Sequence, residues 1–380
     1  MKIKDIISIY ADHAEESLEY VRFDEFNRRL DDGEIDGFEL LLRLPSGEHQ
    51  PISPMSATIF ANDLPTYRAL VTEDLAQRRE IVLGLSDFPE NLQSYDRLLQ
   101  LVSRKAGVIS FVGAGFSVAA GCPLWSDYIA HQAARAMLDS EVVVQRLSNG
   151  EHESVMDEVI ENLTVNVFQR DFAAQFEGSG VDPTNSPSAI LMDIFNGCFV
   201  TTNFDRVLEN SNPDRSFSEK VVGNDSTGRF PKAMYRNERY LLKLHGNIDE
   251  QRDRVLTRDE YDRSYGDFEG AINYELPVPR VLKKLFSNCT VMFVGCSLLA
   301  DRYLRVLKES YDDSPEYFPD HFAILVAPDD EGQRLLRDQF LAGHGITPIW
   351  FSDGDWMKPQ EILELLKVDL GRLSSGSTHY

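Results

Sequence analysis

Four short polar clusters in the chain each follow an apolar run and carry residues suited to binding or proton transfer. They span residues 113–117, 201–205, 243–247 and 295–297. The first reads Gly-Ala-Gly-Phe-Ser; glycine lets a backbone turn tightly and approach a ligand, and the free N–H groups that open a following helix favour phosphate. The third contains His245, and histidine accepts protons near neutrality because its ordinary pKa is about 6.5. Together the clusters predict one crevice with a phosphate cradle and a base.

Apolar strands must position these clusters. The runs that read as strands lie at 108–112, 198–202, 240–244, 290–294, 322–327 and 346–351. Helices are predicted around them at about 89–102, 126–138, 189–195, 204–209, 278–286, 300–307, 332–341 and 359–366. Short continuous apolar strands that alternate with helices are typical of a parallel sheet covered on both faces. We therefore predict a doubly wound, Rossmann-like α/β fold with helical insertions.

Two stretches interrupt this alternation, and an extra module precedes it. Residues 140–187 look helical, whereas residues 211–239, rich in Asn, Asp, Ser, Gly and Arg, read as a long loop. The first quarter of the chain is predicted to hold helices at 3–21 and 65–83 and a strand at 38–44. We expect three parts: an N-terminal interaction or assembly module at 1–95, the catalytic domain at 96–370 and a flexible tail at 371–380.

The composition restricts the partners of the chain. Its 380 residues include 38 Lys and Arg against 62 Asp and Glu, and the formal net charge of -24 disfavours nucleic acid and anionic lipid. No apolar stretch reaches the about 20 residues that span a bilayer, and the N-terminus does not read as a secretory signal, so we expect a cytoplasmic protein without membrane contact. Cys122, Cys198, Cys289 and Cys296 show no C-x-x-C spacing, which predicts buried thiols and no zinc or other metal site.

The four clusters together resemble the sirtuin-like family, and its prokaryotic NAD-consuming branch more than its protein deacylases. The resemblance covers about residues 105–355. It implies that NAD is the substrate, that Asn203 holds the nicotinamide ribose, that His245 is the catalytic base and that Asp205 supports them. It also implies a set of dinucleotide contacts: Gly113, Ala114, Gly115 and Ser117 at the diphosphate, Thr202 and Gly246 beside the catalytic side chains, and Gly295 and Ser297 toward the adenosine half.

The chemistry of the bond between nicotinamide and ribose explains why these residue types are needed. The bond breaks through an oxocarbenium-like centre, and nicotinamide leaves as a neutral molecule. The protein must therefore orient the ribose, exclude stray water and accept one proton from a ribose hydroxyl or an attacking water. An imidazole suits the last task, and the amide of Asn203 can both donate and accept hydrogen bonds. Asp205 is expected to bond backbone N–H groups of its own loop rather than to act as an acid.

Each cluster also has a plainer interpretation. The glycines can form a tight strand-to-helix turn in any α/β protein, and Asn203, Asp205 or Ser297 can cap helices. His245 can be a hydrogen-bonded histidine at the end of a strand. Independent structural roles would not readily place all four clusters at strand ends in this order, so their joint occurrence favours the nucleotide site.

The departures from deacylase sirtuins indicate the reaction. Deacylases continue the glycine loop with G-I-P-D-F-R and carry paired zinc cysteines, whereas residues 121–126 read Gly-Cys-Pro-Leu-Trp-Ser and the zinc pairs are missing. A peptide substrate is therefore disfavoured, and hydrolysis of NAD to nicotinamide and ADP-ribose becomes the leading hypothesis. The alternatives are an NAD-dependent protein deacylase or ADP-ribosyltransferase, or a non-catalytic sensor of NAD or ADP-ribose.

The resemblance further implies a biological setting. Proteins of this branch deplete NAD as effectors of bacterial antiphage defence, an abortive response that halts the phage by starving the cell. We therefore expect a homo-oligomer that stays inactive until it is triggered, with a HerA-type ATPase as the candidate partner. Only the resemblance, and no residue pattern, supports that partner.

Overall fold

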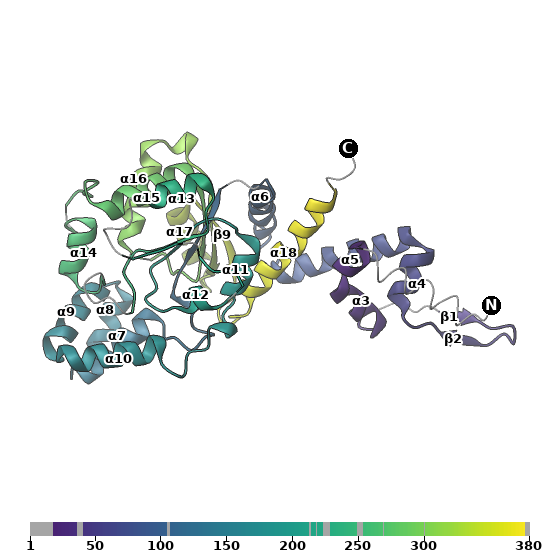
Figure 1. Cartoon of the computed structure of the whole chain (residues 1–380), viewed down its shortest axis with the longest axis horizontal. Helices are drawn as coiled ribbons and strands as arrows, with labels where there is room; N and C mark the ends of the chain where they lie inside the picture. The colour runs from purple at the N-terminus through teal and green to yellow at the C-terminus, as the bar shows by residue number, and fades with distance from the viewer. Residues whose placement is uncertain are drawn as a thin grey trace. The chain divides into compact units, whose positions relative to one another are not determined.

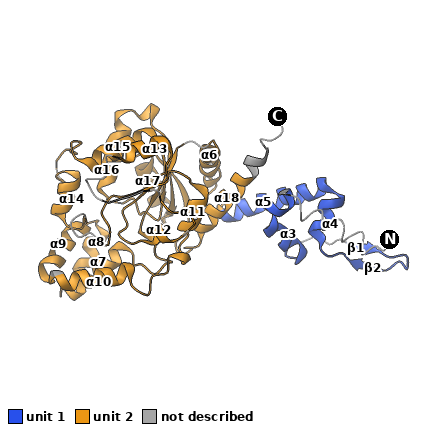
Figure 2. Ribbon diagram, in the orientation of Figure 1, with its two compact units in different colours: residues 1–82 blue, residues 83–380 orange. Residues whose placement is uncertain are grey.

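The computed structural model of the chain describes residues 18–35, 41–104, 107–212, 214–217, 219–222, 229–248, 254–268, 270–299 and 301–376. These residues form two compact units, one within Met1–Val82 and one within Leu83–Tyr380 (Figure 2). The predicted boundary at residue 95 falls inside α6 (Asn91–Ser103), a helix of the second unit. The hydroxyl of Tyr95 donates a hydrogen bond of 2.9 Å to Asp369 in α18 (Lys358–Gly376) and so ties the two helices together. The predicted tail begins inside α18, and residues 377–380 lie outside the described ranges.

The first unit combines helices with one short antiparallel hairpin. Its elements are α2 (Leu18–Arg22), α3 (Asp24–Asp31), β1 (Leu41–Arg43), β2 (His49–Pro51), α4 (Met55–Asn62) and α5 (Leu64–Val82). Its core is aromatic: the fully buried ring of Tyr67 packs 5.6 Å from that of Phe26, and its hydroxyl donates to the Asn27 side chain at 2.7 Å. Helix α5 confirms the helix predicted at 65–83, whereas residues 3–17 of the first predicted helix lie outside the described ranges.

The second unit is built on a seven-stranded sheet in which every neighbouring pair is parallel. The strands are β3 (Val108–Val112), β4 (Phe199–Thr201), β5 (Glu219–Val222), β6 (Tyr240–Lys243), β7 (Thr290–Val294), β8 (His321–Val326) and β9 (Ile346–Phe351). Their order in the sheet is β5-β6-β4-β3-β7-β8-β9. The chain thus starts in the middle at β3, builds one side with β4, the outer strand β5 and then β6 between them, and returns to build the other side from β7. Ligand crevices of doubly wound sheets form at such a switch of direction.

The strand register brings the four polar clusters to one edge of the sheet. Val112 pairs with Thr201 of β4 and with Val294 of β7, and Thr201 pairs with Lys243 of β6. The residues that follow these four strands therefore start at the same height. The strands themselves are buried along their whole length, because helices cover both faces of the sheet.

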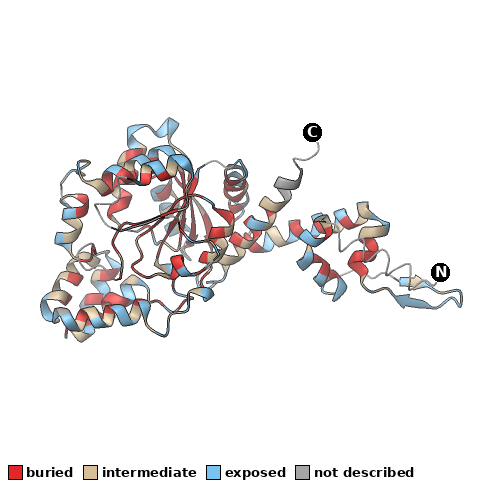
Figure 3. Ribbon diagram, viewed as in Figure 1, coloured by how far each residue is buried: buried red, intermediate tan, exposed pale blue. Residues whose placement is uncertain are grey.

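Helices lie on opposite sides of the sheet, as Figure 1 shows. One group comprises α13 (Phe230–Arg236), α15 (Pro277–Asn288) and α16 (Arg302–Asp313), with α15 packed against both others. The other includes α6, α11 (Ser188–Ile194) and α18, with α12 (Val207–Asn210) beside α11. Helix α17 (Glu331–Ala342) packs against β9. Figure 3 shows the buried strands enclosed by helices that alternate between buried and exposed positions. The doubly wound α/β fold predicted from the sequence is therefore confirmed.

A group of insertion helices forms a second core beside the sheet. It contains α7 (Trp125–Arg135), α8 (Ser140–Ser148), α9 (His152–Asn162) and α10 (Val165–Glu177). Tyr128, Phe172 and Phe176 form an edge-to-face aromatic cluster at its centre. Asp139 caps α8 by accepting hydrogen bonds from two backbone N–H groups of its first turn. The helical character predicted for residues 140–187 is confirmed.

The prediction of one long loop at 211–239 is wrong in two places, where the chain forms a strand and a helix. The edge strand β5 pairs with β6, and α13 packs its buried Phe230 and Ala233 against β6 and α15. Burial of these apolar residues outweighs the polar composition of the surrounding segment. Helix α14 (Arg258–Tyr265), which the sequence analysis did not predict, begins with a capping box between Thr257 and Glu260. Within the described ranges, no helix has the length and hydropathy needed to cross a lipid bilayer.

Candidate functional site

One cavity of about 520 Å³ is lined by residues that follow β3, β4, β6 and β7. A cavity of this size accommodates a small organic ligand. Nine of the eleven predicted site residues line it: Gly113, Ala114, Gly115, Thr202, Asn203, Asp205, His245, Gly295 and Ser297. The other two, Ser117 and Gly246, are buried but are not part of its lining. The structure thus brings all four clusters together, although they are far apart in the sequence.

Glycines allow two loops of the site to pack directly on each other. The N–H group of Gly115 donates to the carbonyl of Gly295 at 2.9 Å. A Cβ atom on Gly113 would collide with that carbonyl, and one on Gly295, whose φ is +66°, would lie 2.7 Å from the Phe116 nitrogen. Loop packing therefore requires glycine at these positions before any ligand binds. The loop continues into a short 3₁₀ turn, η1 (Ala114–Phe116), and α7 begins only after several further residues.

Asn203 and Asp205 are joined through Ser117. The Asn203 amide nitrogen donates to the Gly113 carbonyl at 3.1 Å and to the Ser117 hydroxyl at 3.2 Å. Asp205 accepts from the Val207 N–H at 2.9 Å, the type of backbone bond expected of it. Burial raises the pKa of the Asp205 carboxyl, against the opposing effects of a nearby lysine and of hydrogen bonds that include one with Ser117. Ser117 therefore acts within the cavity wall, and not at the cavity surface where a phosphate contact was predicted.

Lys243 connects the loops that carry Asn203 and His245. Its ammonium group forms an ion pair of 3.1 Å with the Glu209 carboxylate in α12 and hydrogen bonds of 3.3 Å with the Phe204 carbonyl and the Asn247 side chain. The lysine sits at the end of β6 and is buried, so its charge depends on these partners. Lys243 thus fixes the position of the second cluster relative to the third.

His245 lies just beyond β6 with both ring nitrogens close to phenolic hydroxyls of α14. Its Nε2 is 2.9 Å from the Tyr265 hydroxyl, and its Nδ1 is 3.4 Å from the Tyr261 hydroxyl. Burial, together with the guanidinium of Arg302, lowers the pKa of His245 to about 3. The ordinary histidine pKa of about 6.5 therefore does not apply at this buried position, because desolvation destabilises the imidazolium. The imidazole is neutral at physiological pH, and its lone pair can still accept a hydrogen bond.

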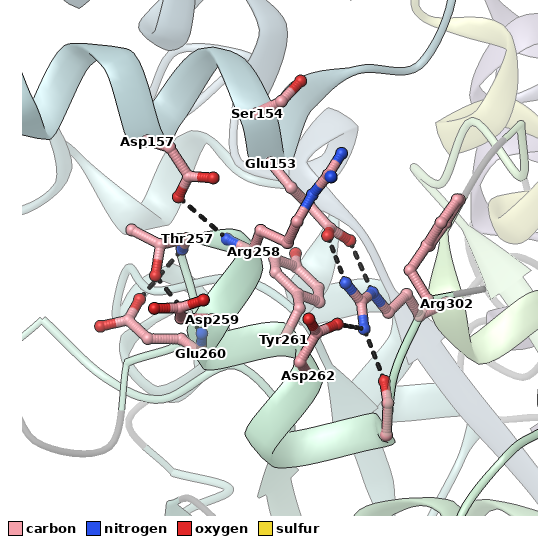
Figure 4. Close-up of polar contacts among 12 residues, drawn as sticks. Glu153, Ser154, Asp157, Thr257, Arg258, Asp259, Glu260, Tyr261, Asp262 and Arg302 are labelled. Atoms are coloured by element: carbon pink, nitrogen blue, oxygen red, sulfur yellow. Dashed lines mark hydrogen bonds and ion pairs between the residues drawn. The ribbon is translucent and has the colours of Figure 1, made fainter. Parts of the chain in front are cut away.

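A buried arginine holds α14 in place over His245. Arg302 is at the start of α16, and its guanidinium donates to both carboxylate oxygens of Glu153 in α9, to Asp262 in α14 and to the carbonyl of Gly266 (Figure 4). The guanidinium also lies 5.3 Å from the centre of the Tyr261 ring. This clasp of Glu153, Arg302 and Asp262 connects α9, α14 and α16 around the cavity.

Comparison with known proteins identifies this part of the chain. Residues 197–349 match the family described as the SIR2-like domain. This part of the chain is similar to the SIR2-like domain. The resemblance to sirtuin-like proteins predicted from the four clusters is thereby confirmed. The match includes the clusters around Asn203, His245 and Gly295, whereas the glycine loop at 113–117 precedes it.

The chain is also similar to a curated enzyme. It is 22% identical over 237 residues to NAD(+) hydrolase ThsA of Enterococcus faecium. The aligned residues make up 62% of this chain and 45% of the relative. The chain therefore spans less than half the length of that enzyme.

The cavity also meets the first turn of α7. Leu124, Trp125, Ser126 and Asp127 all contribute to its lining. Leu124 precedes the helix and makes no side-chain capping bond, so the first N–H groups of α7 have no side-chain cap among the residues that the structure describes. Uncapped helix N-termini bind phosphate groups well. Among the described residues, no group of three or more His, Cys, Asp and Glu side chains is placed to hold a metal ion.

The residues that hold the site together were not predicted from the sequence. Lys243, Glu153 and Arg302 had no predicted role, and the helix with the two tyrosines was not predicted. Two signals were present. The segment RDEYDRSY places two tyrosines four residues apart in an otherwise polar stretch, so both lie on one side of a helix. A lysine inside the apolar strand YLLKL has to be paired if the strand is buried.

Proposed function

We propose that the SIR2-like unit binds NAD and hydrolyses it to nicotinamide and ADP-ribose. The observation that carries this proposal is the convergence of Asn203 and His245 with two glycine loops on one cavity at the switch point of the sheet. The similarity to an enzyme named NAD(+) hydrolase supports the choice of substrate and reaction.

The residues of the cavity suit the parts of a dinucleotide. The uncapped first turn of α7 offers backbone N–H groups and a helix dipole to the diphosphate, and the glycine loop at Gly113 lies in the wall of the same cavity. Asn203 donates its amide hydrogens inward, to Gly113 and Ser117, so its Oδ1 is the atom that can accept a bond from a ribose hydroxyl or a water. These contacts would orient the sugar while the aromatic side chains of Trp125 and Phe204 restrict water.

The reaction requires one proton acceptor. The C–N bond between nicotinamide and ribose breaks, nicotinamide leaves as a neutral molecule, and the oxygen of a water forms a bond to the ribose carbon. The water loses one proton in this step. The neutral imidazole of His245 lines the cavity and is the group we assign to receive it.

Nicotinamide release tests the proposal. Purified protein is incubated with NAD, and nicotinamide is quantified for wild type, His245→Ala and Asn203→Ala. We expect each substitution to lower the rate by about 100-fold or more, since a positioned base contributes on this order. His131→Ala, a substitution of an exposed histidine in α7, is the matched control and should keep the wild-type rate. Release that His245→Ala does not change would overturn the assignment. An acylated peptide in the same assay tests the deacylase alternative.

We further propose that the enzyme serves as an NAD-depleting effector of antiphage defence. Expression in bacteria challenged with phage should lower cellular NAD, and the His245→Ala variant should not. Unchanged NAD in infected cells that contain active enzyme would contradict this role.

We also propose that the protein forms a homo-oligomer and pairs with a HerA-type ATPase. Co-purification of the two chains and nicotinamide release by each preparation test the pairing.

A further inference from the structure

Two tyrosines of α14 differ in how they meet His245. The hydroxyl of Tyr265 is 2.9 Å from Nε2, and its side chain is 3% exposed and not part of the cavity lining. The hydroxyl of Tyr261 is 3.4 Å from Nδ1, a long contact, and Tyr261 does line the cavity. Nδ1 is therefore the nitrogen on the side that a ligand can reach, whereas Nε2 is turned toward a buried phenol.

The protonation state of the imidazole restricts what each nitrogen does. A neutral imidazole carries one N–H and one lone pair. A proton acceptor at Nδ1 must hold the lone pair there, so Nε2 must carry the hydrogen and donate it to the Tyr265 oxygen. The opposite tautomer would place the hydrogen on Nδ1 and leave no acceptor at the cavity. A phenol can donate or accept, so the direction of the bond between Nε2 and the Tyr265 hydroxyl determines whether His245 can act as a base at Nδ1.

The surroundings of His245 hold α14 and both tyrosines in a fixed position. Besides the clasp by Arg302, the carboxylate of Asp157 in α9 accepts the N–H group of Arg258 at 3.1 Å, at the start of α14 (Figure 4). The ionisable groups around the imidazole are the two phenols of α14, the Arg302 guanidinium with its paired carboxylates Glu153 and Asp262, and Asp301, which acts electrostatically on Tyr265.

We propose that Tyr265 is a positioning residue that fixes the Nε2–H tautomer of His245 and presents Nδ1 as the proton acceptor, while Tyr261 occupies Nδ1 until a substrate hydroxyl or water replaces it. The inference rests on the proposed function of His245. The two tyrosines have separate roles. Tyr265 orients the imidazole through Nε2, and the ligand replaces the contact of Tyr261 with Nδ1.

The test combines kinetics with a spectroscopic measurement. In protein with ¹⁵N-labelled histidine, the His245 signals are assigned by their loss in His245→Gln, and their shifts report the tautomer. Wild type should show protonated Nε2 and unprotonated Nδ1. Tyr265→Phe should mix the tautomers and lower kcat by about 10-fold to 100-fold with little change in KM, because the base is present in the wrong form for part of the time. Tyr274→Phe, which removes a hydroxyl that donates to Glu309 at 2.9 Å outside the cavity lining, is the matched control and should keep both the tautomer and kcat within about 3-fold of wild type.

Two results would overturn the inference. One is a wild-type His245 protonated at Nδ1, and the other is a Tyr265→Phe variant that is folded by circular dichroism and keeps the wild-type tautomer and kcat. The tautomer is measured in unmodified protein without turnover, so it tests the positioning role even where a variant folds poorly. Absence of nicotinamide release from wild type would instead count against the proposed function, and the two failures are thereby distinguished.

Discussion

The ammonium group of Lys243 lies 3.1 Å from the Glu209 carboxylate, and each of these side chains is 1% exposed. The pair joins the end of β6 to α12, which follows the loop of Asn203 and Asp205. Two opposite charges without access to water stabilise each other, and removal of either leaves the other buried without compensation. The position of two site loops therefore depends on an ion pair that does not line the cavity.

Lys243→Met should destabilise the protein by about 3–5 kcal/mol, since it leaves the Glu209 carboxyl without its cation. The free energy of unfolding in urea measures the effect. The double variant Lys243→Met, Glu209→Leu removes both charges and should recover most of the loss. Lys308→Met, which breaks an exposed i,i+4 pair with Asp312, is the control and should cost about 1 kcal/mol or less. Equal losses for Lys243→Met and Lys308→Met would contradict the role of the buried pair.

Gly295→Ala should separate the two glycine loops. An alanine there would have a φ of +66° and a Cβ 2.7 Å from the Phe116 nitrogen, so the loop has to shift. We expect a loss of about 1–3 kcal/mol in the free energy of unfolding and weaker NAD binding by calorimetry. Gly107→Ala, where a Cβ would meet no atom within 4 Å, should leave both unchanged. A Gly295→Ala variant as stable as Gly107→Ala would show that the loops do not need this close approach.

The sheet could be predicted from the sequence where its strands are continuous apolar runs. The strands at 108–112 and 290–294 were predicted with the bounds that the structure has, because both are buried along their length between helices. Strand β5 and helix α13 could not be predicted in the same way. They lie in a segment dominated by turn-forming residues, and they form because Phe230 and β6 provide partners that are distant in the sequence.

The loops that form the site could be predicted from the sequence, but the side-chain contacts between them could not. Asn203 and His245 follow apolar strands, and a parallel sheet must bring such positions to one edge. The contacts of His245 with Tyr261 and Tyr265 depend on where α14 docks, which no local pattern specifies. The lowered pKa of His245 has the same origin, because burial follows from the packing of separate elements around the ring.

Two buried histidines should make the protein sensitive to acid. Burial is the main cause that lowers the pKa of both His245 and His321 to about 3, whereas histidine in an unfolded chain has a pKa of about 6.5. Between these values the unfolded chain binds more protons, so stability is complete above about pH 6.5 and is lost as pH falls toward 3. Each histidine contributes up to about 1.4 kcal/mol per pH unit in this window.

Urea unfolding at about pH 7 and about pH 5 measures this loss. His321→Asn keeps an acceptor for the Val291 N–H, which the His321 Nδ1 now accepts at 3.1 Å, but removes the titrating ring. The variant should lose about 2 kcal/mol less stability than wild type between the two pH values. His131→Asn, on the exposed surface of α7, should lose as much as wild type. A His321→Asn variant with the wild-type pH dependence would show that this ring does not contribute.

Two buried serines of neighbouring segments should respond oppositely to loss of their hydroxyls. The Ser117 hydroxyl accepts a hydrogen bond from Asn203 and forms another with Asp205. Ser117→Ala should therefore lower the free energy of unfolding by about 1–3 kcal/mol. It should also lower the rate of nicotinamide release by about 10-fold, because Asn203 loses its orientation. Ser110 in β3 is fully buried, and its hydroxyl has no hydrogen-bond partner among the described residues. Ser110→Ala removes an unsatisfied polar group and should leave stability equal or raise it by about 1 kcal/mol, with the rate unchanged. Thermal unfolding and the nicotinamide assay measure both variants in parallel. If the two substitutions lower stability and rate to the same extent, the link from Ser117 to Asn203 and Asp205 has no special part in the site.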